Sequence, residues 1–270
     1  MKIVAFSDSH ASGHPSSWSA FFDKRAIGLF NHHYFRKHRH NQDYLSIMVD
    51  KILEISPDVV ICTGDITTSG EPSEFKLTCD LIKPLIENKN FEFLYVPGNH
   101  DYYVNDKICI NALKDTFYYL NRNKIKFEDL PHSLNINGLN FCLTNSCKPI
   151  NLMLSTGRMN DKTINYVLDW LDKDTLGPNI LVGHYPLIEE HPIMRFRHKL
   201  WGHEKVLNAL IRKKIDLSLC GHIHDPSVKL DKQGRGEIII GSLTRNACFA
   251  LIEYDEKKDL FTYNKIRVDD

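Results

Sequence analysis

The chain alternates short apolar runs with segments in which apolar residues recur every three or four positions. Short apolar runs predict buried β-strands, and the three-to-four spacing predicts amphipathic helices. The predicted strands are residues 3–6, 58–62, 91–96, 140–144, 179–182 and 216–220. Helices are expected at 43–55, at 160–171 with Asn160 as N-cap, and at 203–215.

The pattern changes after Asp225, where apolar runs at 236–241, 247–254 and 260–268 are separated by turn-rich or charged segments. These runs predict antiparallel strands. Asn137-Gly138 between two further runs predicts another hairpin. No repeat or linker is visible, so we expect one α/β domain over residues 1–270 that mixes βαβ units with antiparallel strands.

Composition fits an ordinary globular protein, with 270 residues, 42% hydrophobic and 25% charged residues. The formal net charge of zero argues against a whole-chain affinity for nucleic acid. The seven cysteines form no CxxC pair, which favours reduced, buried thiols. We find no export signal and no run long enough to cross a bilayer, so a cytoplasmic location is expected.

Five of the apolar runs end, mostly through a glycine, in side chains that are able to bind a metal ion. These side chains are Asp8 and His10, Asp65, Asn99 and His100, His184, and His222 and His224. Ligands of open α/β sheets bind beyond the carboxyl ends of the strands, so the five groups are expected to converge. Taken alone, each of these residues would more often belong to a turn, cap a helix or lie in the core. The recurrence of such side chains at five strand ends favours a metal site.

Imidazole and carboxylate groups together suit manganese, iron, zinc or cobalt rather than calcium. Seven ligands taken from these eight side chains would exceed what one catalytic ion with open positions needs, and they would fit two ions with one shared aspartate. Two-metal sites favour hydrolysis of phosphate esters, because they clamp the attacking and leaving oxygens.

The motifs DSH, GD, GNHD, GHYP and GHIH, in this order over residues 8 to 224, resemble those of the calcineurin-like metallophosphoesterase family. The resemblance implies two facing mixed β-sheets flanked by α-helices, a four-layer sandwich. It also implies that Asp8, His10 and His224 bind one metal. Asn99, His184 and His222 would then bind the second, and Asp65 would bridge both.

The same resemblance assigns His100 to catalysis, where it stabilises or protonates the leaving oxygen. Asp101 is expected to fix the turn or to contact a ligand. Some relatives carry an aspartate shortly after the GD motif that orients the catalytic histidine, whereas Thr67 and Thr68 stand here. The residue that orients His100 is therefore not identified by the sequence.

Two segments are candidates for substrate selection. The insertion at about 18–40 is aromatic, basic and rich in histidine, including His32, His33, His38 and His40. It is read as a packed helical hairpin, as a cap over the site, or as a contact with anionic lipid at the inner face of the membrane. Arg195, Arg197 and Lys199 could hold a phosphate or be solvated charges. His191, His198 and His203 are expected to stay outside the metal shell.

The expected function is hydrolysis of a small anionic phosphodiester with two divalent ions, Mn, Fe or Zn. The GDxT…GxPxEF pattern is similar to the cyclic-nucleotide branch of the family, so a cyclic nucleotide is the first candidate. The alternative is a pyrophosphatase that acts on a nucleotide-linked lipid precursor such as UDP-diacylglucosamine. A non-catalytic scaffold is disfavoured because no motif residue is missing, and the sequence does not indicate an oligomeric state.

Overall fold

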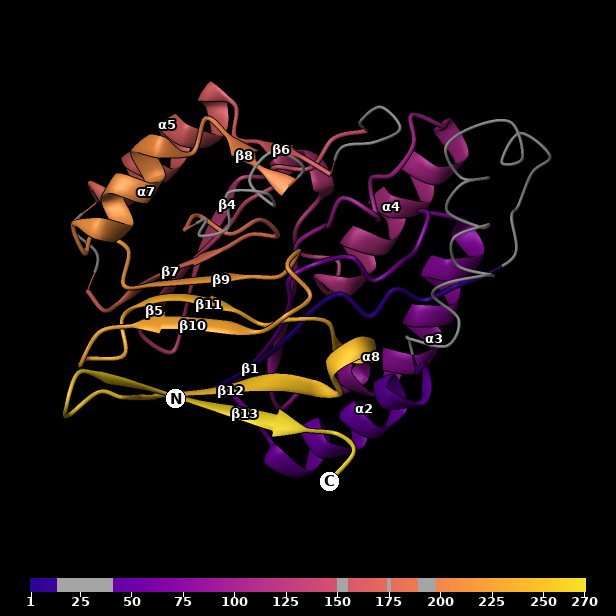
Figure 1. Ribbon diagram of the computed structural model, residues 1–270, viewed down its shortest axis with the longest axis horizontal. Coiled ribbons are helices and arrows are strands. Elements are labelled where there is room, and N and C mark those ends of the chain that lie inside the picture. Colours follow the sequence, from indigo (N-terminus) through magenta and orange to yellow (C-terminus); the bar gives the residue numbers. More distant parts are fainter. Residues whose placement is uncertain (14–40, 150–154, 174–175, 189–197) are drawn as a thin grey trace.

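The computed structural model describes residues 1–13, 41–149, 155–173, 176–188 and 198–270. Within these residues, two mixed sheets lie between two groups of helices (Figure 1). Helices α2 (Asp43–Ile55), α3 (Pro72–Glu87) and α4 (Lys107–Leu120) lie on one side, and α5 (Asp161–Leu171) and α7 (Glu204–Ile211) lie on the other. The predicted arrangement of two facing sheets flanked by helices is confirmed.

The first sheet has five strands in the order β13-β12-β1-β2-β3. Their bounds are Leu260–Arg267, Cys248–Asp255, Lys2–Phe6, Val59–Cys62 and Glu92–Tyr95. β1, β2 and β3 run parallel, whereas β12 pairs antiparallel with both β1 and β13. The three parallel strands therefore end at one edge, which positions the motifs that follow them.

The second sheet has six strands in the order β10-β11-β9-β7-β5-β4. Their bounds are Ser227–Leu230, Gly236–Ile239, Leu217–Cys220, Asn179–Val182, Leu139–Leu143 and His132–Ile136. β5, β7, β9 and β11 are parallel, and the predicted Asn137-Gly138 hairpin joins β4 to β5 with positive φ at both turn residues. A small sheet pairs β6 (Gly157–Arg158) with β8 (Leu200–Trp201), and short helices lie at Phe127–Asp129 and at Leu243–Asn246 (α8).

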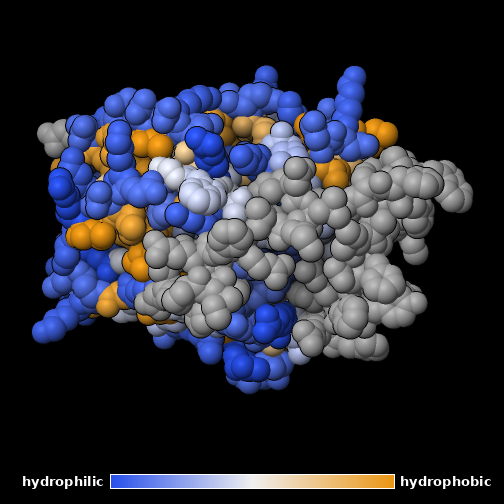
Figure 2. Space-filling model, turned by 45° about the horizontal axis from the view of Figure 1, so that its top comes forward, coloured by the Kyte–Doolittle hydropathy of each residue, from blue (hydrophilic) through white to orange (hydrophobic). Residues whose placement is uncertain are grey.

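Two apolar clusters hold the layers together. The larger one joins both sheets to α2, α3 and α4 and includes fully buried Phe6, Phe93 and Phe117. The smaller one packs α5 and α7 on the outer face of the second sheet, around Val167 and Val206. The described part of the surface in Figure 2 is mainly hydrophilic, with scattered apolar patches.

The strand segment after Asp225 divides between the sheets in a way that the hairpin prediction did not anticipate. β10 and β11 do form an antiparallel pair, but β11 also adds in parallel to β9. β12 crosses to the first sheet and pairs with β1. The tail thereby ties the two sheets together.

Helices α3 and α4 were absent from the predicted helices, although each carries a start signal. α3 begins with Pro72 at its first turn and Glu74 in a capping box. The side chain of Asp106 caps α4 by accepting from the backbone N–H groups of Ile108 and Cys109. The helix over 43–55 matches α2, and Asn160 caps α5 as expected.

All seven cysteines are free and six of them are buried, which confirms the thiol prediction. In the part of the chain that is described, every helix is too short or too polar to serve as a membrane span. The prediction of one domain over 1–270 stays a prediction. The insertion at 18–40, with His32, His33, His38 and His40, lies outside the described residues.

Candidate metal centre

The structure brings the five predicted strand ends together between the two sheets. Asp8 and His10 follow β1, Asp65 follows β2, and Asn99 and His100 follow β3 of the first sheet. His184 follows β7 of the second sheet, and His222 and His224 follow β9. Side chains far apart in sequence thus meet at one place, because both sheets present carboxyl ends there.

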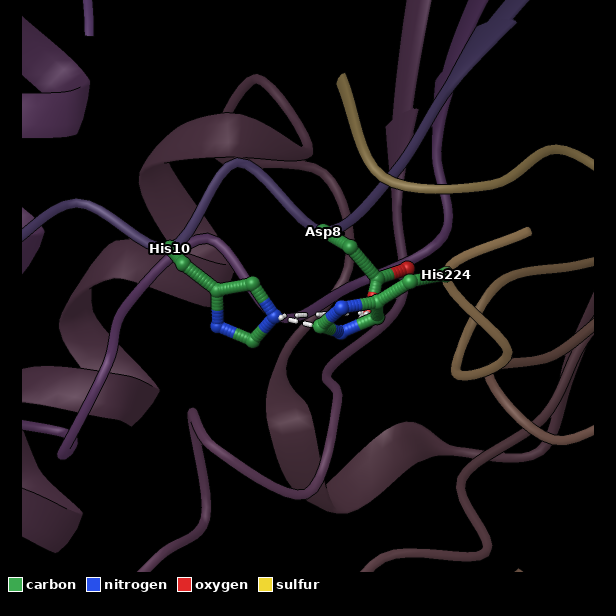
Figure 3. A group of neighbouring side chains, drawn as sticks. All are labelled: Asp8, His10 and His224. Carbon is green, nitrogen blue, oxygen red and sulfur yellow. Dashed lines mark hydrogen bonds and ion pairs between the residues drawn. The ribbon is translucent and has the colours of Figure 1, made fainter. Parts of the chain in front are cut away.

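Asp8, His10 and His224 form a first group of potential ligands and point toward one another (Figure 3). The Nε2 atoms of His10 and His224 lie 3.0 Å apart. Oδ1 of Asp8 lies 3.6 Å from Nε2 of His10 and 3.4 Å from Nε2 of His224. These are the two imidazoles and the carboxylate that the resemblance assigns to one metal.

A second group consists of Asp65, His184 and His222, all of them buried. Asn99 belongs to the same place, because its Oδ1 lies 3.1 Å from Nε2 of His184. Oδ2 of Asp65 lies 3.4 Å from Nε2 of His184 and 3.9 Å from Nε2 of His10. Asp65 therefore faces both groups with a single oxygen.

The loop after β2 orients three of the imidazole rings through its backbone carbonyls. Nδ1 of His184 lies 2.8 Å from the carbonyl oxygen of Thr63, and Nδ1 of His10 lies 3.2 Å from that of Thr67. Nδ1 of His100 lies 2.6 Å from the carbonyl oxygen of Thr68. A carbonyl only accepts, so each Nδ1 carries the proton and each Nε2 faces the site.

The Thr68 carbonyl thus does for His100 what an aspartate side chain does in some relatives of the family. Tyr103 stacks on a face of the His100 ring, at a centroid distance of 5.2 Å and an interplanar angle of 14°. Of the two threonines at this place, Thr68 thus holds the His100 ring through its main-chain oxygen, and Thr67 holds the ring of His10 in the same way.

Asp101 fixes the turn that carries Asn99 and His100. Its Oδ1 accepts from the backbone N–H and the hydroxyl of Thr67, at 3.0 and 2.9 Å. Its Oδ2 accepts from the Tyr95 hydroxyl at 2.8 Å and from the Gly98 N–H at 2.9 Å. Asp101 therefore joins the loops after β2 and β3.

The backbone at the site is unusual, because Asp8, His10, Asp65 and His222 all have φ between 46° and 65°. Non-glycine residues seldom adopt this left-handed conformation, and it costs free energy that the surroundings must offset. A Cβ at Gly98 would overlap the Asp65 carboxylate, and one at Gly221 would overlap the Ser7 hydroxyl. The motif glycines therefore allow neighbouring loops to approach closely.

Burial would raise the pKa of the Asp8 and Asp65 carboxyls, but the surrounding imidazoles outweigh it and lower both values. Burial likewise would lower the pKa of His184, yet the Asp65 carboxylate raises it to about 9. Among the described residues, buried Oδ1 of Asp8 has no hydrogen-bond donor. A buried carboxylate oxygen without a donor, surrounded by imidazole nitrogens, fits a divalent cation.

A pocket of about 260 Å³ opens onto this centre. Of the described residues, those that line it are Asp65, Asn99, His100, Ser155, His198, His222, Ile223, His224, Asp225 and Arg245. Ser155, Asp225 and Arg245 were not foreseen from the sequence, since no motif or strand end marks them. His198, expected outside the metal shell, lies in the pocket wall.

The other predicted side chains lie elsewhere. Lys199 stacks on Trp201, with Nζ 4.1 Å from the ring centroid, and is not among the described residues that line the pocket. His203 stands at the N-cap of α7. Arg195, Arg197 and His191 lie outside the described residues.

The family model for calcineurin-like phosphoesterases matches residues 1–226. The chain belongs to this family, whose members use a centre of two metal ions.

Individual relatives agree with this assignment. The chain is 29% identical over 195 residues to a protein of Arcobacter nitrofigilis named as a probable glycerophosphodiester phosphodiesterase. That match covers 71% of this chain and 65% of the relative, so less than two thirds of the relative's length is represented.

Two solved structures share the fold. A dimetal phosphatase from Danio rerio superposes with a TM-score of 0.67 at 14% identity, and the match covers 99% of this chain and 96% of that one. A purple acid phosphatase from yellow lupin superposes with a TM-score of 0.63 at 11% identity, over 100% of this chain and 52% of that one.

The raised pKa of His184 predicts that metal uptake releases a proton. Metal-free protein holds this proton below pH about 9, and a ligand imidazole must lose it. We therefore expect the apparent affinity for Mn²⁺ to rise with pH toward about 9, and calorimetric heats to depend on the ionisation enthalpy of the buffer. Heats that are independent of the buffer at pH 7.5 would contradict this protonation state.

Proposed function

We propose that this protein is a metal-dependent phosphodiesterase with a centre of two divalent ions. Asp8, His10 and His224 hold one ion, and Asn99, His184 and His222 hold the other. Asp65 bridges them. The observation that carries the proposal is the position of Oδ2 of Asp65, within 4 Å of Nε2 of both His10 and His184.

The bound ions supply a water activated near neutral pH and neutralise charge on the phosphoryl oxygens. Asp65 and Asp8 are held as carboxylates by the imidazoles around them. The backbone carbonyls of Thr63 and Thr67 hold the rings of His184 and His10, so that Nε2 of each ring is available as a ligand.

His100 serves the leaving oxygen. Its Nδ1 proton is engaged by the Thr68 carbonyl, and its ring lines the pocket. Nε2 is thus the atom that faces a bound ester, and in the protonated ring it donates a proton to the departing oxygen. Its backbone N–H is fixed by Oδ1 of Asp65 at 2.7 Å, which ties the catalytic ring to the bridging ligand.

The substrate that we propose is a small diester with one negative charge per phosphate. The pocket of about 260 Å³ suits a small molecule, and Arg245 provides a cation in its wall. A cyclic nucleotide remains the first candidate from the sequence pattern. A glycerophosphodiester is the second, because it is the substrate class in the name of the Arcobacter nitrofigilis relative.

Two other functions receive less support. Cleavage of a nucleotide-linked lipid such as UDP-diacylglucosamine depended on the insertion at 18–40, which lies outside the described residues, as does its suggested contact with a membrane. A non-catalytic scaffold would not require seven converged ligands, nor the His100 imidazole beside them.

The test of the proposal is a substrate panel with chelated protein reloaded with Mn²⁺. Bis(p-nitrophenyl) phosphate and the monoester p-nitrophenyl phosphate come first, followed by a cyclic nucleotide, a glycerophosphodiester and UDP-diacylglucosamine. We expect the diester to be cleaved well above the monoester, and Asp65→Asn to be inactive. Preference for the monoester, or turnover without metal, would overturn the proposal.

Replacing His100 by alanine should slow turnover without releasing metal. A positioned general acid contributes about 10²–10⁴-fold, so kcat for bis(p-nitrophenyl) phosphate should fall at least about a hundredfold. Metal content, measured by elemental analysis, should stay at the wild-type value. His132→Ala in strand β4 is the matched control, and an unchanged kcat in the His100 variant would remove this residue from the mechanism.

Arg245→Gln should weaken substrate binding and leave the chemical step intact. The Arg245 guanidinium is half exposed and lies 3.6 Å from a carboxylate oxygen of Asp225, so its net attraction for an anion is small. We expect KM to rise about twofold to fivefold with kcat unchanged. Arg212→Gln, at an exposed position just after α7, is the control, and equal KM values for the two variants would show that Arg245 does not contact the substrate.

A further inference from the structure

The His222 ring is held differently from the other imidazole of the second group, His184. His184 is oriented by a main-chain carbonyl, whereas Nε2 of His222 lies 3.1 Å from Nδ1 of His198. The two rings meet at a centroid distance of 5.0 Å and an angle of 60°. His198 follows the His184 motif in sequence and is not a member of the candidate metal-binding groups among the described residues.

The rest of the His222 environment leaves its ring little freedom. Its backbone is left-handed, with φ of 65°, and its N–H donates to Oδ2 of Asp8 at 3.1 Å. The Tyr185 ring packs against it at a centroid distance of 4.3 Å. The imidazole is thus enclosed by Tyr185 on one side and contacted by His198 on another.

The contact with His198 engages Nε2 of His222 and leaves Nδ1 as the other nitrogen of the ring. A neutral imidazole has one N–H and one lone pair, and a ligand histidine uses the N–H to reach a neighbour. If Nε2 of His222 donates to the lone pair of His198 Nδ1, the lone pair of His222 is on Nδ1. Nδ1 is then the atom that the ring offers to the ion shared with Asp65 and His184.

We propose that His198 is a positioning residue, which fixes the tautomer and the ring orientation of His222 at the second metal. The inference rests on the proposed dimetal function and adds a residue that the sequence motifs do not contain. The pocket wall includes His198, so the same side chain would border a substrate bound in that pocket.

Two substitutions separate the hydrogen bond from the packing of the ring. His198→Phe keeps an aromatic ring against His222 but has no nitrogen. His198→Asn places an amide oxygen near the position of Nδ1 and retains the acceptor. His132→Phe, in strand β4, is the control for an imidazole-to-phenyl change away from the centre, and thermal melts establish that each variant is folded.

The measurement is the titration of metal-free protein with Mn²⁺ and Co²⁺, followed by calorimetry and by the visible spectrum of bound Co²⁺. Loss of such an outer hydrogen bond typically costs about 10–100-fold in metal affinity. We expect this loss at one of the two sites in His198→Phe, with the other site unchanged. Affinity in His198→Asn should lie near the wild-type value, as should that of His132→Phe.

Equal affinities in wild type and His198→Phe would overturn this inference alone, and so would an Asn variant as weak as the Phe variant. Wild-type protein that binds fewer than two ions would overturn the proposed function and this inference with it. The two failures are therefore distinguishable by the wild-type titration.

Discussion

The centre depends on the main chain of the loop between Thr63 and Thr68. Its carbonyls hold the rings of His184, His10 and His100, and the carbonyls of Gly64 and Asp65 accept from the backbone N–H groups of Asp8 and His10. Asp65 within this loop faces both ligand groups. One short segment after β2 thus aligns side chains from both sheets, and its geometry is maintained by backbone hydrogen bonds that buried groups cannot exchange for water.

This alignment has an energetic cost that the fold offsets. Asp8 and Asp65 are almost fully buried, and a buried carboxylate is stable as an anion only with partners. The imidazoles supply part of the compensation, because they lower the pKa values of both carboxyls. The left-handed backbone at four of the proposed ligand positions adds strain of the kind that concentrates at functional sites. Divalent ions at this centre would complete the compensation, because they would neutralise the buried carboxylates.

Much of the fold could be predicted from the sequence because its signals are local. Apolar runs that end in glycine marked the strands whose ends form the centre, and the periodicity over 43–55 matched α2. Helices α3 and α4 were missed although their caps were present. The pairing of β12 with β1 could not be predicted from periodicity, because the same alternation suits either sheet. Pairing is decided by which apolar faces pack together in the core.

The sequence by itself determined which side chains are proposed to supply the chemistry, because the aspartate, asparagine and histidine residues that follow the strands can be identified directly from it. Tertiary structure alone decided how those side chains are held. The group that orients His100 is a backbone carbonyl. Every residue has a backbone carbonyl, so the amino-acid sequence could not identify this one. Tertiary structure also decided the contact of His222 with His198 and the position of the Arg245 cation in the pocket wall. Both residues approach the centre only when loops from different strands pack at the same edge.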